Sequence, residues 1–172
     1  YAFPFYFVQL SSINRPGWPS FRYSQLKMMQ QLPHTGMAVS SDLGHPTDVH
    51  PPRKKPIGER LAGMALHFNY GHSERIPFGP MPLKAERKNK EIIVSFNFAG
   101  GQLRTADELA IRGFKLLTNK GVALEAAATI RKNQVVIAAD AAENWQEVWY
   151  GWEPFTQANL TNAQGLPAST FR

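Results

Sequence analysis

Phe5-Tyr6-Phe7-Val8-Gln9-Leu10 is the stretch that decides the fold. A short run so rich in aromatic and aliphatic side chains predicts a strand that is buried on both faces, as the strands of parallel sheets are. A second short buried strand is predicted at residues 35–40, around Met37-Ala38-Val39. We therefore expect the first part of the chain to be built on a sheet.

The segment between the two strands predicts a loop followed by a helix. Residues 11–19 contain two prolines and a glycine, which is typical of a loop. Ser20 is the expected N-cap of the helix, and Pro33 is expected to end it. The apolar residues predicted to share the buried face of this helix are Phe21, Met28, Met29 and Leu32.

A second helix is predicted after the polar loop that follows residue 41. Its apolar residues recur at helical spacing and are Ile57, Leu61, Met64, Ala65 and Phe68. Gly71 suits the position just beyond the end of a helix. Residues 1–71 thus predict strand, helix, strand, loop and helix, which is the order of a parallel sheet with crossover helices.

The rest of the chain has a different character, because short strand-like runs alternate with turns that contain Gly-Gly, Asn-Lys-Gly or Lys-Asn. The runs cover residues 91–98, 113–117, 122–130, 134–138 and 147–152. This spacing is typical of an antiparallel β-sandwich. A cluster of prolines in residues 72–88 marks the boundary. We predict an α/β fold with one domain at 1–72 and a β-sandwich-like domain at 73–172.

Composition narrows the class of protein. The chain has 172 residues, 43% of them hydrophobic and 19% charged, and it contains no Cys. It is therefore expected to be globular, without disulfides, thiolate metal sites or a Cys nucleophile. No apolar run approaches the roughly 20 residues of a membrane span. The net charge of +6 comes without a nucleic-acid-binding signature, so we predict a solvated surface rather than nucleic-acid binding.

The candidate chemistry lies in the loop Asp42-Leu43-Gly44-His45-Pro46-Thr47-Asp48-Val49-His50-Pro51. The loop follows a predicted strand of a parallel sheet, at the edge where open α/β sheets place their ligands. His50 is the first choice for a general base, because histidine is the residue type whose unperturbed pKa lies nearest neutrality and a carboxylate can orient its ring. Asp48 or Asp42 can supply that carboxylate, and the spacing does not choose between them.

Other chemistries are less well supported by the sequence. His45 and His50 with the two aspartates are considered as metal ligands, but they lack the helical His pair of many zinc sites, so no metal or cofactor is predicted. None of the early hydroxyls lies in a Gly-x-Ser-x-Gly or Gly-Asp-Ser setting; they are Ser11, Ser12, Ser20, Ser40 and Ser41. Gln9 and Asn14 are the only candidate oxyanion donors.

An aromatic cluster near the end of the chain offers a possible sugar-stacking platform. It consists of Trp145, Trp149, Tyr150 and Trp152. Since Trp149 and Tyr150 point to opposite faces of a strand, the whole cluster does not serve one surface. A role in the core of the β-rich part is favoured.

Ordered motifs along nearly the whole chain resemble the sialate O-acetylesterase family. They are Pro4-Phe5-Tyr6-Phe7-Val8-Gln9, Thr35-Gly36-Met37-Ala38-Val39, Asp42-Leu43-Gly44, residues 48–62, Trp149-Tyr150-Gly151-Trp152, residues 158–162 and residues 165–172. The resemblance implies an SGNH-type serine hydrolase with a flavodoxin-like α/β core and a β-rich accessory domain. It also implies metal-independent hydrolysis of O-acetyl esters on sialic acids or other sugars, with His50 as the base.

Two departures from the family pattern shape the expectation. The triad acid usually stands three residues before the histidine, where this chain has Thr47, so Asp48 or Asp42 must replace it or a Ser–His dyad must suffice. The Gly-Asp-Ser nucleophile block and the later Gly and Asn blocks are absent. We therefore expect a C-terminal half that needs an N-terminal segment or subunit for activity.

Several alternatives stay open at this point. The same chemistry on acetylated plant polysaccharides is one, and a non-catalytic carbohydrate-binding module is another. A periplasmic or secreted location is expected. The sequence does not choose the sugar or the position of its acetyl group.

Overall fold

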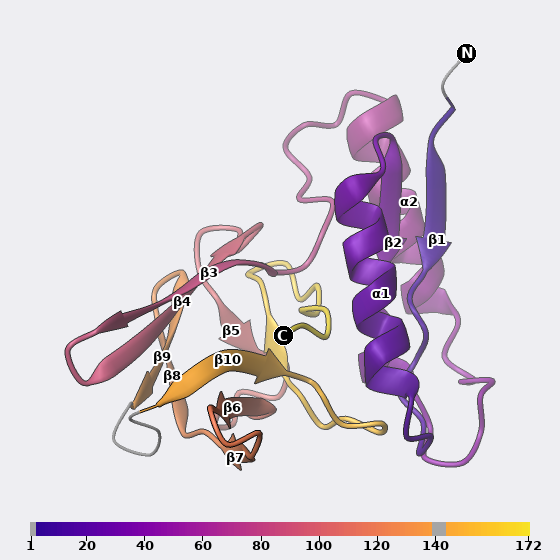
Figure 1. Cartoon of the computed structure of the whole chain (residues 1–172). Helices are drawn as coiled ribbons and strands as arrows, with labels where there is room; N and C mark the ends of the chain where they lie inside the picture. Colours follow the sequence, from indigo (N-terminus) through magenta and orange to yellow (C-terminus); the bar gives the residue numbers. More distant parts are fainter. Residues whose placement is uncertain (1–2, 139–143) are drawn as a thin grey trace.

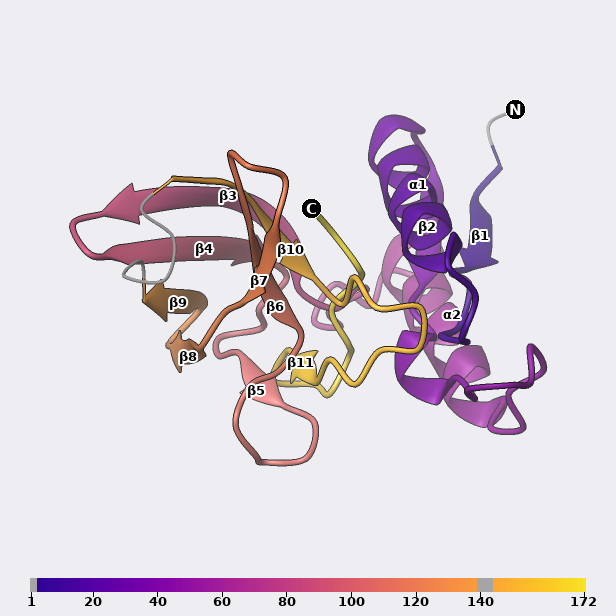
Figure 2. The same cartoon turned by 60° about the horizontal axis from the view of Figure 1, so that its bottom comes forward.

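The computed structural model describes residues 3–138 and 144–172; Tyr1 and Ala2 of the predicted first domain lie outside them. Strands β1 (Phe5–Val8) and β2 (Thr35–Ala38) form a parallel pair in which Phe5 stands opposite Thr35. Helices α1 (Trp18–Gln31) and α2 (Lys55–Asn69) lie on the two sides of this pair (Figures 1 and 2). The predicted order of strand, helix, strand, loop and helix is confirmed. Neither helix has the length and apolar character that a membrane span requires.

The β-rich part holds several antiparallel sheets. One has the order β3-β4-β9-β8 and consists of β3 (Met81–Lys88), β4 (Glu91–Asn97), β9 (Gln134–Ala138) and β8 (Ala128–Arg131). Another has the order β10-β6-β7 and consists of β10 (Trp145–Tyr150), β6 (Phe114–Thr118) and β7 (Ala123–Glu125). Short strands β5 (Arg104–Thr105) and β11 (Leu160–Thr161) pair with each other.

The antiparallel sheets share one buried core. Alternate residues of β4, β6 and β10 point inward, because side chains alternate between the two faces of a strand. The largest of them are Ile92, Phe96, Phe114, Leu116 and Tyr150. This agrees with the predicted antiparallel architecture, and the chain as a whole is a mixed α/β protein. The flavodoxin-like sheet stays a prediction, because the described residues contain only two parallel strands.

The final segment returns from the β-rich part to α1. Arg22 of α1 donates hydrogen bonds to the carbonyl oxygens of Gly151 (2.9 Å) and Pro154 (3.0 Å) and to Thr170 Oγ1 (2.8 Å). Phe171 joins the same core cluster as Leu26 of α1. The last 22 residues therefore pack against both parts of the chain. The domain division at residue 72 stays a prediction.

The predicted buried face of α1 is wrong for three of its four residues, since only Met29 is buried as expected. Phe21, Met28 and Leu32 are 59%, 38% and 50% exposed, whereas Arg22 is fully buried with Leu26 and Met29. The returning segment decides this face, because its carbonyl groups satisfy the Arg22 guanidinium. The helix also begins earlier than predicted, with Gly17 rather than Ser20 at the N-cap.

Two further strand predictions need correction, one for β1 and one for the run at residues 122–130. Phe5 and Val8 of β1 are 54% and 37% exposed rather than buried on both faces, because β1 pairs only with β2 in the described residues. The proline-rich segment 72–88 contains β3, an edge strand. An edge strand tolerates Pro82, which lies where the register to β4 shifts. The single run at 122–130 is divided into β7 and β8.

Candidate active site

The loops that follow β1 and β2 are tied together at the carboxyl ends of the strands. Ser40 Oγ donates to the carbonyl oxygen of Gln9 (2.6 Å), and Ser12 Oγ donates to that of Ser41 (2.7 Å). The N–H of Asn14 donates to the carbonyl oxygen of Pro46 (3.0 Å). These bonds hold the loop that carries His50 against the sheet.

Gly44 allows the two loops to approach each other closely. A Cβ atom at this position would lie 2.1 Å from the carbonyl oxygen of Ser12. Only glycine fits such a contact without movement of the backbone. The start of the polar loop is therefore fixed by the loop after β1.

His50 and Asp48 lie side by side at the surface. The backbone N–H of His50 donates to Asp48 Oδ1 (2.8 Å), and its Nδ1 atom lies 3.3 Å from the same oxygen. The His50 and Asp48 side chains are 85% and 57% exposed. The hydrogen bond from the His50 backbone, followed by the charge of the ring, lowers the pKa of Asp48. The predicted alternation in an extended segment thus brings this pair together.

Asp42 has a different partner. Its two carboxylate oxygens accept hydrogen bonds from Arg60 of α2, at 2.8 Å from Nη1 and 2.7 Å from Nη2. Arg60 also donates to the carbonyl oxygen of Val39 (2.6 Å). Asp42 and Arg60 therefore join the short 3-10 turn at Ser41–Leu43 to α2. The geometry favours Asp48 over Asp42 as the partner of His50.

His45 stabilises the turn between the two aspartates. Its Nδ1 atom accepts hydrogen bonds from the backbone N–H groups of Thr47 (3.3 Å) and Asp48 (3.2 Å). This nitrogen is the acceptor in both bonds. Within residues 3–138 and 144–172, no three His, Asp or Glu side chains converge as metal ligands.

Three of the candidate hydroxyl and amide groups are used within the fold, those of Gln9, Ser12 and Ser40. Gln9 is fully buried, and its Nε2 atom donates to the carbonyl oxygen of Arg22 (2.9 Å) and to Ser169 Oγ (2.7 Å). It is therefore not free to act as an oxyanion donor. Ser12 and Ser40 are also buried and use their hydroxyls to tie the loops together. In the described part of the chain, no serine hydroxyl hydrogen-bonds to the His50 ring.

The aromatic cluster at the end of the chain divides into two environments. Tyr150 is buried, and its hydroxyl oxygen accepts the N–H of Leu160 (2.7 Å), which confirms a role in the core for this residue. The Trp152 ring is tilted against Trp149 and meets Tyr23 edge to face, with ring centroids 5.2 and 5.7 Å away. Arg172 lies over the Trp152 ring at 5.4 Å. The contribution of α1 to this surface was not foreseen, because Tyr23 is 129 positions away in the sequence.

Two asparagines in residues 158–162, one of the motifs that resemble the sialate O-acetylesterase family, form hydrogen bonds within the fold. Asn159 bonds to Asp107 (2.8 Å), to the carbonyl oxygen of Ala110 (3.0 Å) and to the N–H of Arg112 (2.9 Å). Asn162 donates to the carbonyl oxygen of Phe78 (3.0 Å) and accepts two backbone N–H groups. These side chains fix loops rather than line the His50 site.

Comparison with known proteins shows a similarity in structure to a carbohydrate esterase. No protein-family model matches the chain, and no curated protein sequence matches it. A carbohydrate acetylesterase from Xanthomonas citri has a similar structure, with a TM-score of 0.87 and 33% sequence identity over 98% of this chain. The chain spans 40% of the length of that enzyme. The similarity supports a relationship to carbohydrate esterases.

Proposed function

We propose that this chain is the histidine-bearing part of a carbohydrate O-acetylesterase. The observation that carries the proposal is the His50–Asp48 pair in the loop after β2, in a chain that is similar over 98% of its length to a carbohydrate acetylesterase. The sequence motifs favour O-acetylated sialic acid as the substrate. Acetylated plant polysaccharide is the closest alternative.

The chemistry assigns one role to each member of the pair. His50 Nε2 removes the proton of a serine hydroxyl as that oxygen attacks the acetyl carbonyl carbon, and Asp48 orients the ring through Nδ1. The tetrahedral intermediate collapses to an acetyl-serine, and His50 returns the proton to the departing sugar hydroxyl. Water then attacks the acetyl group with the same base, which releases acetate and restores the serine.

The serine is proposed to come from an N-terminal segment or subunit that extends the β1–β2 sheet. The N–H groups of Phe5 and Gln9 donate to β2 and its flanking residues, so Tyr6 and Val8 present their backbone groups to the other edge, where Gln25 of α1 donates to the Val8 carbonyl oxygen (3.4 Å). Next to this open edge, α1 exposes Phe21, Met28 and Leu32. An open strand beside exposed apolar side chains is a surface that a further strand and its connections would cover.

The location is proposed to be periplasmic or secreted. A polymeric acetylated carbohydrate lies outside the cytoplasm. A chain without Cys forms no disulfides, so it requires neither an oxidising nor a reducing compartment. Detection of the native protein in a periplasmic or culture-medium fraction tests this point. Recovery with a cytoplasmic marker would contradict it.

The decisive experiment is an esterase assay on the protein at its full natural length. Acetate release is measured from O-acetylated sialic acid, acetylated xylan and an aryl acetate. His50→Ala is expected to lower kcat at least about a thousandfold, as loss of a triad base does. His72→Ala is the matched control, since His72 Nδ1 lies 3.3 Å from Glu74 Oε1 at a different surface position. Full activity in His50→Ala would overturn the proposal.

A second candidate function is carbohydrate binding without catalysis. The observation that favours it is the surface formed by Tyr23, Trp149 and Trp152. Saturable sugar binding by a full-length protein that hydrolyses none of the three esters would support this candidate against the esterase.

A further inference from the structure

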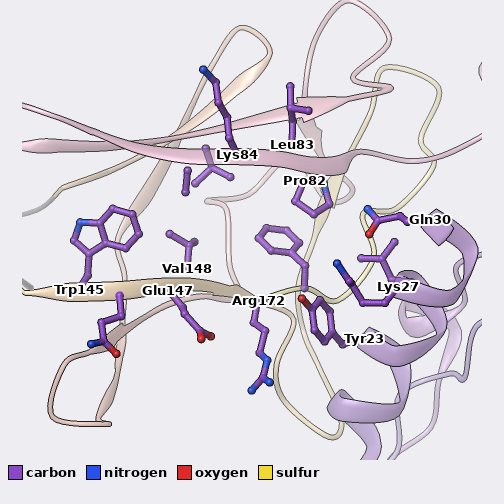
Figure 3. Close-up of a pocket in the computed structure, with 15 residues that line it drawn as sticks. Tyr23, Lys27, Gln30, Pro82, Leu83, Lys84, Trp145, Glu147, Val148 and Arg172 are labelled. Carbon is purple, nitrogen blue, oxygen red and sulfur yellow. The ribbon is translucent and has the colours of Figure 1, made fainter.

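A cleft with a volume of about 470 Å³ lies between α1, β3 and β10 (Figure 3). It is separate from the His50 loop. Lys27 and Gln30 form its helical wall and lie in the second half of α1. This end of the helix is followed along the chain by the amino end of β2. The His50 loop follows the carboxyl end of β2. Two distinct surfaces of the same fold are therefore available.

The outer edge of β10 supplies backbone hydrogen-bonding groups to this cleft. Tyr150 exchanges two backbone hydrogen bonds with Phe171, at 2.9 and 3.1 Å, on the side of β10 away from β6. Because alternate residues of an antiparallel strand bond in the same direction, Val148 directs its N–H and C=O to that side as well. Val148 lines the cleft. It lies two residues before Tyr150, where Phe171 pairs with the outer edge of β10.

The floor of the cleft is apolar and one wall is aromatic. Val94, Val148 and Phe171 are each at least 95% buried and form part of the lining. Figure 3 shows Trp145 and Val148 extending from β10 on the side that faces β3, with Trp145 at the end of the cleft away from α1. An indole ring and the backbone N–H and C=O of Val148 suit a ligand that has one apolar face and a polar rim.

The charge inside the cleft is positive. Lys27 and Gln30 extend from α1 into the space between the two strands, whereas Glu147 extends to the other side of β10 (Figure 3). Glu147 accepts a hydrogen bond from Trp149 Nε1 (2.7 Å). Within the described residues, Lys27 forms no salt bridge. A carboxylate in the cleft would therefore meet a lysine that no carboxylate of the fold neutralises.

We propose that this cleft binds a saccharide that carries a carboxylate, such as a uronic acid unit of a polysaccharide. The apolar face of one sugar ring lies against Trp145, a neighbouring unit bonds to the Val148 backbone, and the carboxylate of a unit near α1 pairs with Lys27 beside Gln30. The volume is within the range of about 300–1,000 Å³ that is usual for ligand sites. The choice of a saccharide rests on the proposed function, whereas the location of the site does not.

The test is a calorimetric titration of the protein at its full natural length with unacetylated trigalacturonic acid. The neutral galactose trisaccharide is titrated in parallel. The acidic trimer is expected to bind saturably and the neutral trimer at least fivefold more weakly. Trp145→Ala is expected to abolish binding, and Lys27→Met to weaken it at least about fivefold, as loss of one charged hydrogen bond does.

Lys120→Met is the matched control, because Lys120 is an exposed turn residue outside the cleft. It is expected to keep the wild-type affinity. Lys27→Met changes an exposed side chain, so its result does not depend on the folding of the Trp145 variant. Absence of saturable binding, equal affinity for both trimers or unchanged affinity in Lys27→Met would each overturn the proposal. None of these results bears on ester hydrolysis, which the His50→Ala assay tests separately.

Discussion

Arg60 binds both carboxylate oxygens of Asp42, at 2.8 and 2.7 Å, and so connects the turn after β2 to helix α2. The Arg60 side chain is only 12% exposed, and it also donates to the carbonyl oxygen of Val39. Two short, parallel hydrogen bonds between charged groups are among the stronger polar interactions in proteins. The structural role of Asp42 as the partner of Arg60 therefore competes with a role as the acid that orients His50.

Asp42→Asn is expected to lower the free energy of unfolding by about 1–3 kcal/mol, because Arg60 loses a charged acceptor in a mostly buried position. Urea unfolding of the purified variant measures the change. Glu59→Gln is the control, since Glu59 pairs with Lys55 at a well-exposed position on the same helix. A folded Asp42→Asn protein with an activity loss as large as that of His50→Ala would instead make Asp42 the triad acid.

Asp48→Asn is expected to lower kcat at least about a hundredfold, because the His50 ring loses the carboxylate that fixes its tautomer and orientation. Its stability should stay close to that of the wild type, since the Asp48 side chain is more than half exposed. The comparison with Glu74→Gln, beside His72, separates this role from a general effect of surface charge. Wild-type kcat in Asp48→Asn would show that Asp48 is not the acid that orients His50.

The contrast between the two aspartates shows what the sequence can and cannot predict. Asp48 and His50 are two residues apart, and an extended backbone places such side chains together, so their contact follows from local geometry. The partner of Asp42 is 18 residues away on a helix, and its position depends on how α2 packs. Sequence spacing carries no information about that contact.

The same distinction holds for the secondary structure. Helix α2 and strand β9 were predictable, because their patterns repeat within a few residues and clear turn residues flank them. The buried face of α1 was not, because Arg22 finds its carbonyl partners 129 to 132 residues later. An arginine in a helical pattern is normally counted as polar and exposed. The returning C-terminal segment reverses that expectation.

Arg22→Met is therefore expected to lower the free energy of unfolding by at least about 3 kcal/mol, because several buried carbonyl groups lose their donor at once. Burial lowers the pKa of Arg22 to about 10, so the guanidinium remains protonated at neutral pH and donates all of these bonds. Urea unfolding at pH 7 measures the loss, and Arg15→Met, at an exposed loop position, is the control. A change below 1 kcal/mol would contradict the role of Arg22 as the link between α1 and the final segment.

Asp107 predicts a pH dependence of stability. Its hydrogen bonds with Arg112 and then with Asn159 lower its pKa to about 2. The native state thus favours the ionised form, and the resulting stabilisation is complete above the unfolded pKa of about 4 and is lost as pH falls toward 2. Between pH 4 and pH 2, the midpoint of urea unfolding is expected to fall less in Asp107→Asn than in the wild type. Glu108→Gln is expected to keep the pH dependence of the wild type. Parallel curves for Asp107→Asn and the wild type would contradict this assignment.

Gly44→Ala tests how the loop after β1 positions the His50 loop. The new Cβ atom would lie 2.1 Å from the Ser12 carbonyl oxygen and 2.7 Å from the Ser12 nitrogen, and backbone atoms cannot rotate away as a side chain can. The φ angle of Gly44 is −70°, which any residue adopts, so the effect is steric rather than conformational. Separation of the two loops is expected to cost about 1–3 kcal/mol, as overpacking typically does.

The same variant should also affect turnover, since a catalytic base displaced by about 1 Å can lose a hundredfold in rate. Gly58→Ala is the matched control, because no atom lies within 4 Å of its Cβ position and it is in the helix that follows the loop. That control should gain about 0.5–1 kcal/mol, since alanine favours a helix interior more than glycine does. Wild-type stability and kcat in Gly44→Ala would show that the His50 loop does not depend on close contact with Ser12.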